Sequence, residues 1–562
     1  MIGGAKSKSV PLLVGLTLIT LLVYAIQAFL LHPWAIADDA RQFLSWTSRL
    51  YDPASRPGDV LADYWQQTAP PLYGALLHIA AALGVAPVLF AKLLAFPLVA
   101  ITAVLAWKLN ACFTVDARCR LMGSLFVMAA IIHNDSIFSG TPRAFASPLI
   151  LLTLIGLPTR RYGLTIAGLL LLSIVYPAPA ITCLGIFSLW ILAWRFPIGF
   201  SLSWRSVALL ALAAILVLGS ALLFKAGMGD WGPVLRLGEA RSMPSLMSVG
   251  GRSSIVGRGG DIAWLCSPRI GYLPAIINCQ GNGDPRLLVN LLLSVVPMLA
   301  LWVRVRRGQG AGEDSLADSN RAYALFPYAL FPYALLATAI CYLIAALVAF
   351  TFHLPARYSQ PVLLIMGSLA SGLWAGRAWN WLLERKISVK PFARMAIMLF
   401  ATAAAVGIFA TPKTRVVHAE HPDLLAFIAR TPPGTRIAGI SDDLSFIPAL
   451  TGRSVLTTPE HDIPYHKRYH RESQAGLEAS LKMGRFDDLE SVRNYIRRYR
   501  VDLLVFDRNF LTRGELPKSY KAVLPSTTEV SPMFAEAEAL GRARCHIVEG
   551  PGWIALFASC LS

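Results

Sequence analysis

The sequence predicts an α-helical membrane protein with many transmembrane helices and a C-terminal α/β domain. Hydrophobic residues make up 55% of the chain and charged residues only 15%, whereas a soluble protein carries about 25% charged residues. Long apolar runs alternate with short basic segments over residues 1–410, and mixed helix-like and strand-like segments occupy residues 411–562. We therefore expect a transmembrane domain over 1–410 and an α/β domain over 411–562.

The positive charges indicate how the chain crosses the membrane. The net charge is +18, but Lys and Arg lie between apolar runs, which is the positive-inside pattern and does not indicate nucleic-acid binding. All basic loops face the cytoplasm together only if the number of spans is odd, about 11 by the apolar runs. This predicts a cytoplasmic N-terminus, an extracytoplasmic C-terminal domain and, as location, a bacterial inner (plasma) membrane.

The spans are predicted from apolar runs, since a membrane helix needs roughly 20 such residues. Val10–Leu31 follows Lys6 and Lys8 and lacks a small-residue cleavage site, so we interpret it as an uncleaved first span rather than a signal peptide. The other candidates are Ala86–Leu109, Leu121–Ser139, Ala144–Leu157, Leu164–Ala178, Ile181–Trp194, Val207–Phe224, Leu287–Val303, Ala322–Phe350, Ser359–Ala375 and Ala396–Ala410. Pro70–Gly84 is apolar but short, and counting it would break the charge alternation. We expect it to lie flat on the membrane.

Two outer loops are expected, over residues 32–85 and 225–286. An oxidising exterior permits disulfides, and the spacing of the outer cysteines predicts the pairs Cys266–Cys279 and Cys545–Cys560.

The segment after the last span alternates helix and strand patterns. Asp423–Arg430 and Leu489–Tyr499 are helical in pattern, whereas Arg436–Ile440 and Val501–Phe506 have the pattern of strands. This alternation predicts helices layered on a sheet.

An acidic pair, Asp38 and Asp39, follows the first apolar run directly. Ionisable groups at a bilayer edge are candidates for function. The alternative is a solvated start of a helix over Asp39–Leu50, where Asp suits the helix dipole. Asp59 and Asp63 follow in the same loop.

Two further polar sets lie at the ends of predicted spans on the same side of the membrane. One comprises His133, Asn134 and Asp135 with Arg143, and the other contains Arg357-Tyr358. Arginine suits bidentate binding of phosphate. Each set alone could be a polar cap on a hairpin, but three sets at one membrane face favour a single site. No soluble-enzyme motif and no Cys/His spacing typical of zinc is present.

In this arrangement the chain resembles the polytopic glycosyltransferases of the GT-C fold, among them protein O-mannosyltransferases, aminoarabinose transferases and catalytic subunits of oligosaccharyltransferases. The matching features, in order, are Asp38-Asp39-Ala40-Arg41, the Pro70–Gly84 segment beginning Pro-Pro-Leu, and Arg357-Tyr358 followed by Pro361. The chain departs from the family at Asp39, where Glu is usual, and it lacks the Asp-x-Asp metal motif of the oligosaccharyltransferase branch.

The resemblance implies an inverting transfer of sugar from a polyprenyl-phosphate donor to a lipid, glycan or protein acceptor on the outer face. Asp38 would be the general base, within about 2.6–3.2 Å of the acceptor oxygen, and Asp39 a helix cap and orienting neighbour. Arg357 and then Arg143 would stabilise the leaving lipid phosphate. The other candidate substrate-binding residues are Arg41, Asp63, Asp135 and Tyr358. Neither a metal nor another cofactor is expected, and the partners are membrane lipids, donor and acceptor, without nucleic acid.

Two non-catalytic alternatives remain at this point. A flippase or export component for lipid-linked glycans would place charges midway along its spans, where this chain has few acids. A scaffold for envelope assembly would act through the C-terminal domain and would not need Asp38.

Overall fold

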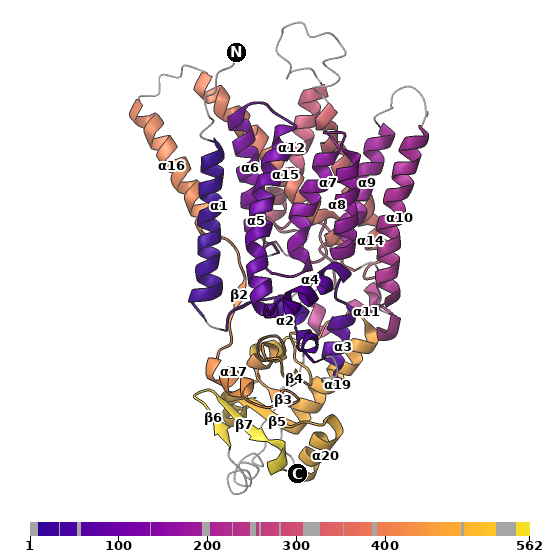
Figure 1. Ribbon diagram of the computed structural model, residues 1–562, viewed down its shortest axis with the longest axis vertical. Helices are drawn as coiled ribbons and strands as arrows, with labels where there is room; N and C mark the ends of the chain where they lie inside the picture. Colours follow the sequence, from indigo (N-terminus) through magenta and orange to yellow (C-terminus); the bar gives the residue numbers. More distant parts are fainter. Residues whose placement is uncertain are drawn as a thin grey trace.

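The computed structural model arranges the apolar helices in one bundle, with a five-stranded sheet beyond one end of it (Figure 1). The residues that the structure describes are 9–32, 34–52, 58–134, 136–193, 203–227, 229–247, 255–257, 260–279, 281, 283–306, 326–351, 353–384, 391–484, 488–523 and 547–561. The short helices of the first outer loop lie between the bundle and the sheet.

Each predicted span overlaps a helix, although the bounds differ and some residues of the spans, among them 322–325, lie outside the described residues. The helices are α1 (Ser9–Ala25), α5 (Pro87–Ala111), α6 (Ala117–Ile132), α7 (Ala146–Gly156), α8 (Tyr162–Val175), α9 (Pro177–Ala193), α10 (Trp204–Gly227), α12 (Arg286–Arg306), α14 (Leu330–Leu347), α15 (Ala356–Glu384) and α16 (Pro391–Ala410). Within the described residues, six helical segments are long and apolar enough to cross a membrane, and several others are shorter. The protein is therefore helical with several candidate spans, while the number 11 stays a prediction.

Two of these helices, α6 and α15, approach each other unusually closely. A Cβ atom built on Gly372 of α15 would lie 2.6 Å from the Cα atom of Gly123 in α6, and one on Gly376 would lie 2.5 Å from the Cα atom of Cys119. Small residues permit such close approach between membrane helices. This close contact holds α15 against α6 along much of their length.

The first outer loop contains α2 (Ala40–Phe43), a 3-10 turn (Thr47–Leu50), α3 (Val60–Gln67) and α4 (Pro71–Ala82). The expected continuous helix over Asp39–Leu50 is wrong, because it breaks after Phe43. The Ser45 hydroxyl donates to the carbonyl of Gln42 at 2.8 Å and the Thr47 hydroxyl to that of Leu44 at 2.7 Å. Side-chain bonds of this kind compete with the helical backbone ladder.

The sheet has the strand order β4 (Ser454–Val455), β3 (Arg436–Ile440), β5 (Leu503–Asp507), β7 (Trp553–Phe557) and β6 (Val548–Glu549). β3 is parallel to β4 and β5, whereas β7 is antiparallel to β5 and β6. The helix predicted over Leu489–Tyr499 is α20 with the same bounds. The expected strand at Arg436–Ile440 is also present.

Alternate strand residues supply two separate cores. Ile437, Leu503 and Val505 pack with α17 (Pro422–Ala429) and with the first outer loop through Trp46. The opposite face packs against α19 (Lys467–Gly484) and α20. The sheet is thus layered between helices, and one face is joined to the loop that carries the acidic pair. A short antiparallel pair, β1 (Ile36–Ala37) with β2 (Val416–Val417), adds a second connection.

The predicted disulfide between Cys266 and Cys279 is confirmed. Asn290 of α12 donates from its amide nitrogen to the carbonyl of Ile277, which fixes the loop to the bundle. Cys560 is disulfide-bonded, and its expected partner Cys545 lies outside the described residues.

Candidate active site

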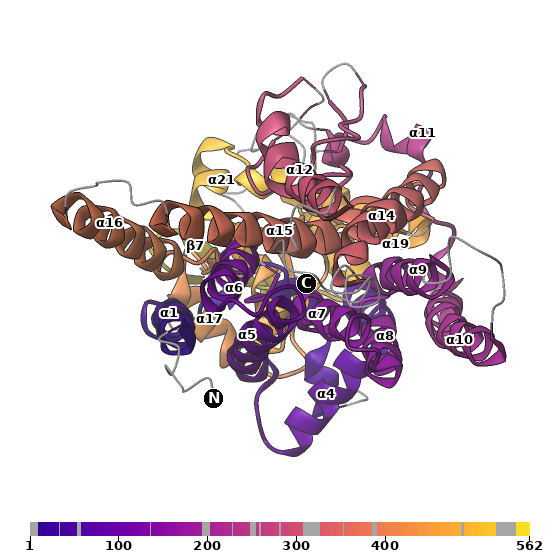
Figure 2. The same cartoon turned by 90° about the horizontal axis from the view of Figure 1, so that it is seen from above.

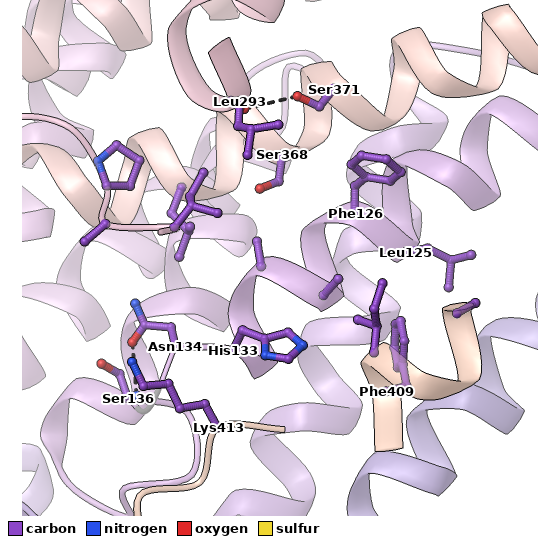
Figure 3. A pocket seen from close by; sticks show the side chains of 18 of the residues that line it. Leu125, Phe126, His133, Asn134, Ser136, Leu293, Ser368, Ser371, Phe409 and Lys413 are labelled. Atoms are coloured by element: carbon purple, nitrogen blue, oxygen red, sulfur yellow. Dashed lines mark hydrogen bonds between the residues drawn. The ribbon is translucent and has the colours of Figure 1, made fainter. Parts of the chain in front are cut away.

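A cavity of about 950 Å³ opens between α1, α6, α15 and α16. This is at the large end of the 300–1,000 Å³ typical of ligand pockets. Figure 3 shows Lys413 near Asn134 and Ser136 on one side of the cavity, with Phe126 and Phe409 further along it. The cavity therefore combines a polar end with an apolar groove.

The groove follows one face of α6. Its lining residues recur every three or four positions, which is the spacing of a single helix face. They are Arg118, Leu121, Met122, Leu125, Phe126, Ala129, Ala130 and His133. At 1.5 Å per residue this stripe is about 22 Å long, so the groove extends over most of the thickness of a bilayer's hydrocarbon core.

The polar end is strongly cationic. Among the described residues that line the cavity, Asp39 is the one carboxylate, and it forms an ion pair with Arg143, which lies in the 3-10 turn Pro142–Phe145 just before α7. The cations at this end come from the turn before α7, α15, the outer loop and the chain after α16: Arg143, Arg269, Arg357, Lys413 and Arg415. Such a set is suited to binding phosphate.

Burial and neighbouring positive charges lower the pKa of Arg143. Burial lowers the pKa of Arg143 to about 9, and the charge of Arg357 is the next largest cause. Arg269 and Arg415 act in the same direction. A pKa of about 9 leaves Arg143 charged at neutral pH, and the carboxylate of Asp39 beside it favours the charged form.

Arg357 lines the cavity and carries one unsatisfied donor. Its Nε atom is buried and has no hydrogen-bond partner among the residues that the structure describes. A buried donor without a partner costs about 1–3 kcal/mol.

Asp38 has a different environment from its neighbour. Its carboxylate pairs with Arg41 and does not line the cavity. Arg41 also lies 3.1 Å from Glu460 Oε2 and donates to Ser445 Oγ at 2.8 Å, and its guanidinium stacks over the Phe446 ring. Arg41 therefore joins the outer loop to the C-terminal part rather than to the cavity.

Asp39 occupies the N-cap position of α2, but its side chain makes no capping hydrogen bond. The expectation that this carboxylate caps the helix is wrong, because the side chain is instead paired with Arg143.

The remaining candidates lie away from the cavity or outside the described residues. Asp63, on α3, pairs with Arg49 at 2.7 Å. Tyr358 is buried, and its backbone carbonyl accepts a hydrogen bond from Thr182 of α9 at 2.7 Å. Asp135 lies outside the described residues. Of the eight predicted site residues, Asp39, Arg143 and Arg357 are brought together at the cavity.

Sequence reasoning missed Arg269, Lys413 and Arg415 as site residues. Arg269 belongs to an Arg-rich loop, which was a usable signal. The position of Arg415 depends on tertiary contacts: its carbonyl accepts from the Asp38 N–H at 3.1 Å, and its φ is +41°. In the part of the chain described, no three His, Cys, Asp or Glu side chains are grouped as metal ligands.

Comparison with solved structures shows the fold. The archaeal oligosaccharyltransferase AglB from Archaeoglobus fulgidus, in complex with an inhibitory peptide and a dolichol-phosphate, matches with a TM-score of 0.51 and 12% identity over 95% of this chain and 72% of that chain. The apo form of the Archaeoglobus enzyme gives 0.47 and 13% over 92% and 72%. ArnT from Cupriavidus metallidurans, bound to undecaprenyl phosphate, gives 0.47 and 12% over 99% and 98%.

No protein-family model and no curated protein matches the chain. The structural likeness to AglB is thus one of fold, without detectable likeness in sequence. The resemblance inferred from the order of the motifs is confirmed at this level: the chain has the fold of the GT-C glycosyltransferases.

Proposed function

We propose that the protein is an inverting membrane glycosyltransferase, which moves a sugar from a polyprenyl-phosphate donor to an acceptor hydroxyl at the outer membrane face. The observation that carries the proposal is the cavity in which Asp39 faces Arg143 and Arg357 where an apolar groove ends. One neighbour of the same fold was solved with a dolichol-phosphate, which is the kind of ligand that such a groove suits.

The donor would bind with its isoprenoid chain along α6 and its phosphate at the cationic end. The stripe from Leu121 to Ala130 offers apolar surface to the chain, and burial of apolar surface contributes about 25 cal/mol per Å². Arg357 lines the cavity at this end, so it is our first choice for the phosphate oxygens. Arg143 would share them.

Asp39 is our choice of general base. It lines the cavity, whereas Asp38 is paired with Arg41 outside it. In the reaction, Asp39 takes the acceptor's hydroxyl proton while the acceptor oxygen forms a bond to the anomeric carbon from the side opposite the phosphate. The bond from that carbon to the phosphate oxygen breaks, and the electron pair leaves with the lipid phosphate. Arginine side chains stabilise the developing charge.

The ion pair between Asp39 and Arg143 gives the donor a second role. A phosphate that binds Arg143 competes with Asp39 for the same guanidinium. Donor binding would thereby release the carboxylate to accept a proton. The base would be available when the donor is in place.

The orientation follows from the basic loops. With these loops in the cytoplasm, the cationic end and residues 411–562 lie outside. The protein would then be an integral protein of a bacterial inner membrane, with an odd number of spans near 11.

The test measures sugar transfer by variants of Asp38 and Asp39, with a polyprenyl-phosphate-linked sugar as donor. General-base catalysis typically raises a rate by 10²–10⁴-fold, so Asp39→Asn should reduce the rate of transfer by about that factor while donor binding is retained. Asp38→Asn, a matched control one residue away, should reduce transfer much less. Thermal unfolding of both purified variants shows whether either change affects folding.

Asp38 would be the base if Asp38→Asn loses transfer and Asp39→Asn keeps it. If both variants transfer sugar at the wild-type rate, the enzymatic proposal fails, and an export or scaffold protein becomes the better account.

A further inference from the structure

The first membrane helix ends in an unusual turn shortly before the acidic pair. α1 is followed by a π-helix over Ile26–Leu30, and the Leu31 N–H donates to the Ile26 carbonyl at 3.1 Å. π-helical turns are rare and occur frequently at functional sites. The residue five positions beyond Ala28 is Pro33, which has no N–H group to continue this bonding pattern. The carbonyl of Ala28 therefore needs a partner from elsewhere in the fold.

Lys92, in the second turn of α5, supplies that partner. Its Nζ atom donates to the Ala28 carbonyl at 2.8 Å and lies 5.3 Å from the centre of the Phe29 ring. The Tyr24 hydroxyl donates in the other direction, to the carbonyl of Lys92, at 3.0 Å. A lysine within a membrane helix is costly and is a candidate for function. Two hydrogen bonds and a cation–π contact thus hold the end of α1 against α5.

Lys92 and the π-helix pack near the segment that carries the acidic pair. Ala28 and Lys92 border a cavity of about 10 Å³ together with Ala37 and Ala40, the residues on either side of the acidic pair. Ligand pockets are far larger, at about 300–1,000 Å³, so these residues pack closely around the small space. The position of Lys92 therefore bears on the position of Asp39.

The turn that carries Arg143 rests on the neighbouring residue of α5. A Cβ atom on Gly140, three residues before Arg143, would lie 2.4 Å from the carbonyl oxygen of Ala91. The Tyr73 hydroxyl donates to the Gly140 carbonyl at 2.8 Å, which holds this turn from its other side. The start of α5 thus contacts the segments of both partners in the ion pair between Asp39 and Arg143.

We propose that Lys92 is a positioning residue for sugar transfer. Its ammonium group fixes the π-helix, the π-helix fixes the start of the first outer loop, and the loop holds the Asp39 carboxylate at the acceptor. The inference rests on the proposed function. A displacement of about 1 Å at a reacting group can reduce a rate about 10²-fold, so a contact at this remove is sufficient to affect turnover. Lys92 is not among the described residues that line the large cavity, so it should act on kcat and not on the KM for the donor.

The test measures kcat and KM of full-length variants with a decaprenyl-phosphate-linked sugar as donor and native membranes as the source of acceptor. Lys92→Met keeps an unbranched side chain and removes the charged donor. It should lower kcat about tenfold or more, because a hydrogen bond to a charged group is worth about that factor, with the KM for the donor unchanged. Lys92→Arg keeps a charged donor and should recover most of the rate. Lys108→Met, in the last turn of α5, is the matched control and should leave both constants unchanged.

A double-mutant cycle separates positioning from a merely structural role. If Lys92 acts through Asp39, Lys92→Met should have no further effect once Asp39 is replaced by Asn, since the two losses are coupled. A structural defect would instead reduce the remaining rate by the same factor in both backgrounds. Thermal unfolding of Lys92→Met should give a midpoint close to that of the wild type, because a membrane helix accommodates methionine more readily than lysine.

The two proposals fail in different ways. Asp39→Asn with the wild-type rate refutes the proposed function. If Asp39→Asn loses transfer while Lys92→Met keeps the wild-type kcat, the reaction stands and the positioning role is refuted. A loss for Lys92→Met that Lys92→Arg does not recover, or that is equally large in the Asp39→Asn background, assigns Lys92 to the fold alone.

Discussion

The two walls of the cavity are built differently. On the α6–α15 side, glycines bring the helices together so closely that a Cβ atom on Gly372 would lie 2.6 Å from the backbone of Gly123. On the α1–α16 side, a Cβ atom on Gly407 of α16 would meet nothing within 4 Å. Figure 2 shows α15 crossing the middle of the bundle beside α6, while α16 extends at the periphery next to α1.

This difference assigns separate tasks to the walls. The closely packed wall carries His133 and Arg357, so we expect it to hold the polar end of the cavity in a fixed geometry. Most described side chains of α16 are exposed, although Phe409 is buried. A wall with few buried side chains can move at little cost in free energy, so we expect lipid chains to enter the groove on this side.

Gly372→Ala should have the largest effect on stability. Its methyl group would overlap the α6 backbone, and overpacking of this kind costs about 1–3 kcal/mol. Thermal unfolding of the purified protein should show a clearly lowered midpoint.

Gly407→Ala is the matched control on the other wall. It has open space and removes a glycine from a helix, which favours the helix by up to about 1 kcal/mol. Equal losses for the two variants would contradict the difference between the walls.

The sequence predicts much of this fold because its strongest signals are local. Apolar runs of membrane length mark the helices, and β3 and α20 have the expected bounds. The close contact between α6 and α15 could not be predicted, since glycine also occurs in α16 without any close neighbour. Which glycine lies in a contact depends on how helices far apart in sequence pack.

The site was predictable in part for the same reason. Acidic and basic residues at span ends indicated Asp39, Arg143 and Arg357, which the cavity brings together. The choice between Asp38 and Asp39 depends on the direction of each side chain after the first span. Asp38 pairs with Arg41 and Asp39 with Arg143, and the second pair joins segments far apart in the sequence, so it does not follow from the local pattern.

Ala404→Phe should have the next largest effect. Ala404 lines the groove from α16, and an aromatic ring there would occupy space that the donor chain needs. We expect the KM for a polyprenyl-phosphate-linked sugar to rise about tenfold, which corresponds to 1.4 kcal/mol, with little change in stability because α16 is exposed.

Ala403→Phe is the control for this change, since Ala403 is exposed but does not line the groove. A rise in KM for Ala403→Phe equal to that for Ala404→Phe would mean that the donor chain lies elsewhere.

Thr20→Val should have the smallest effect, and it tests how α16 is held. The Thr20 hydroxyl donates to the carbonyl of Phe409 at 2.8 Å, which connects α1 to α16. The Thr17 hydroxyl donates at 2.8 Å to Leu13 within α1 itself. A hydrogen bond between membrane helices is worth about 0.6 kcal/mol on average, so Thr20→Val should speed hydrogen exchange in residues 401–410 by about threefold. Thr17→Val should leave that exchange unchanged, because the hydrogen bond that it removes lies within α1. Should both variants exchange at the wild-type rate, α16 is held by its packing alone, and the wall that admits lipid is firmer than its exposed surface suggests.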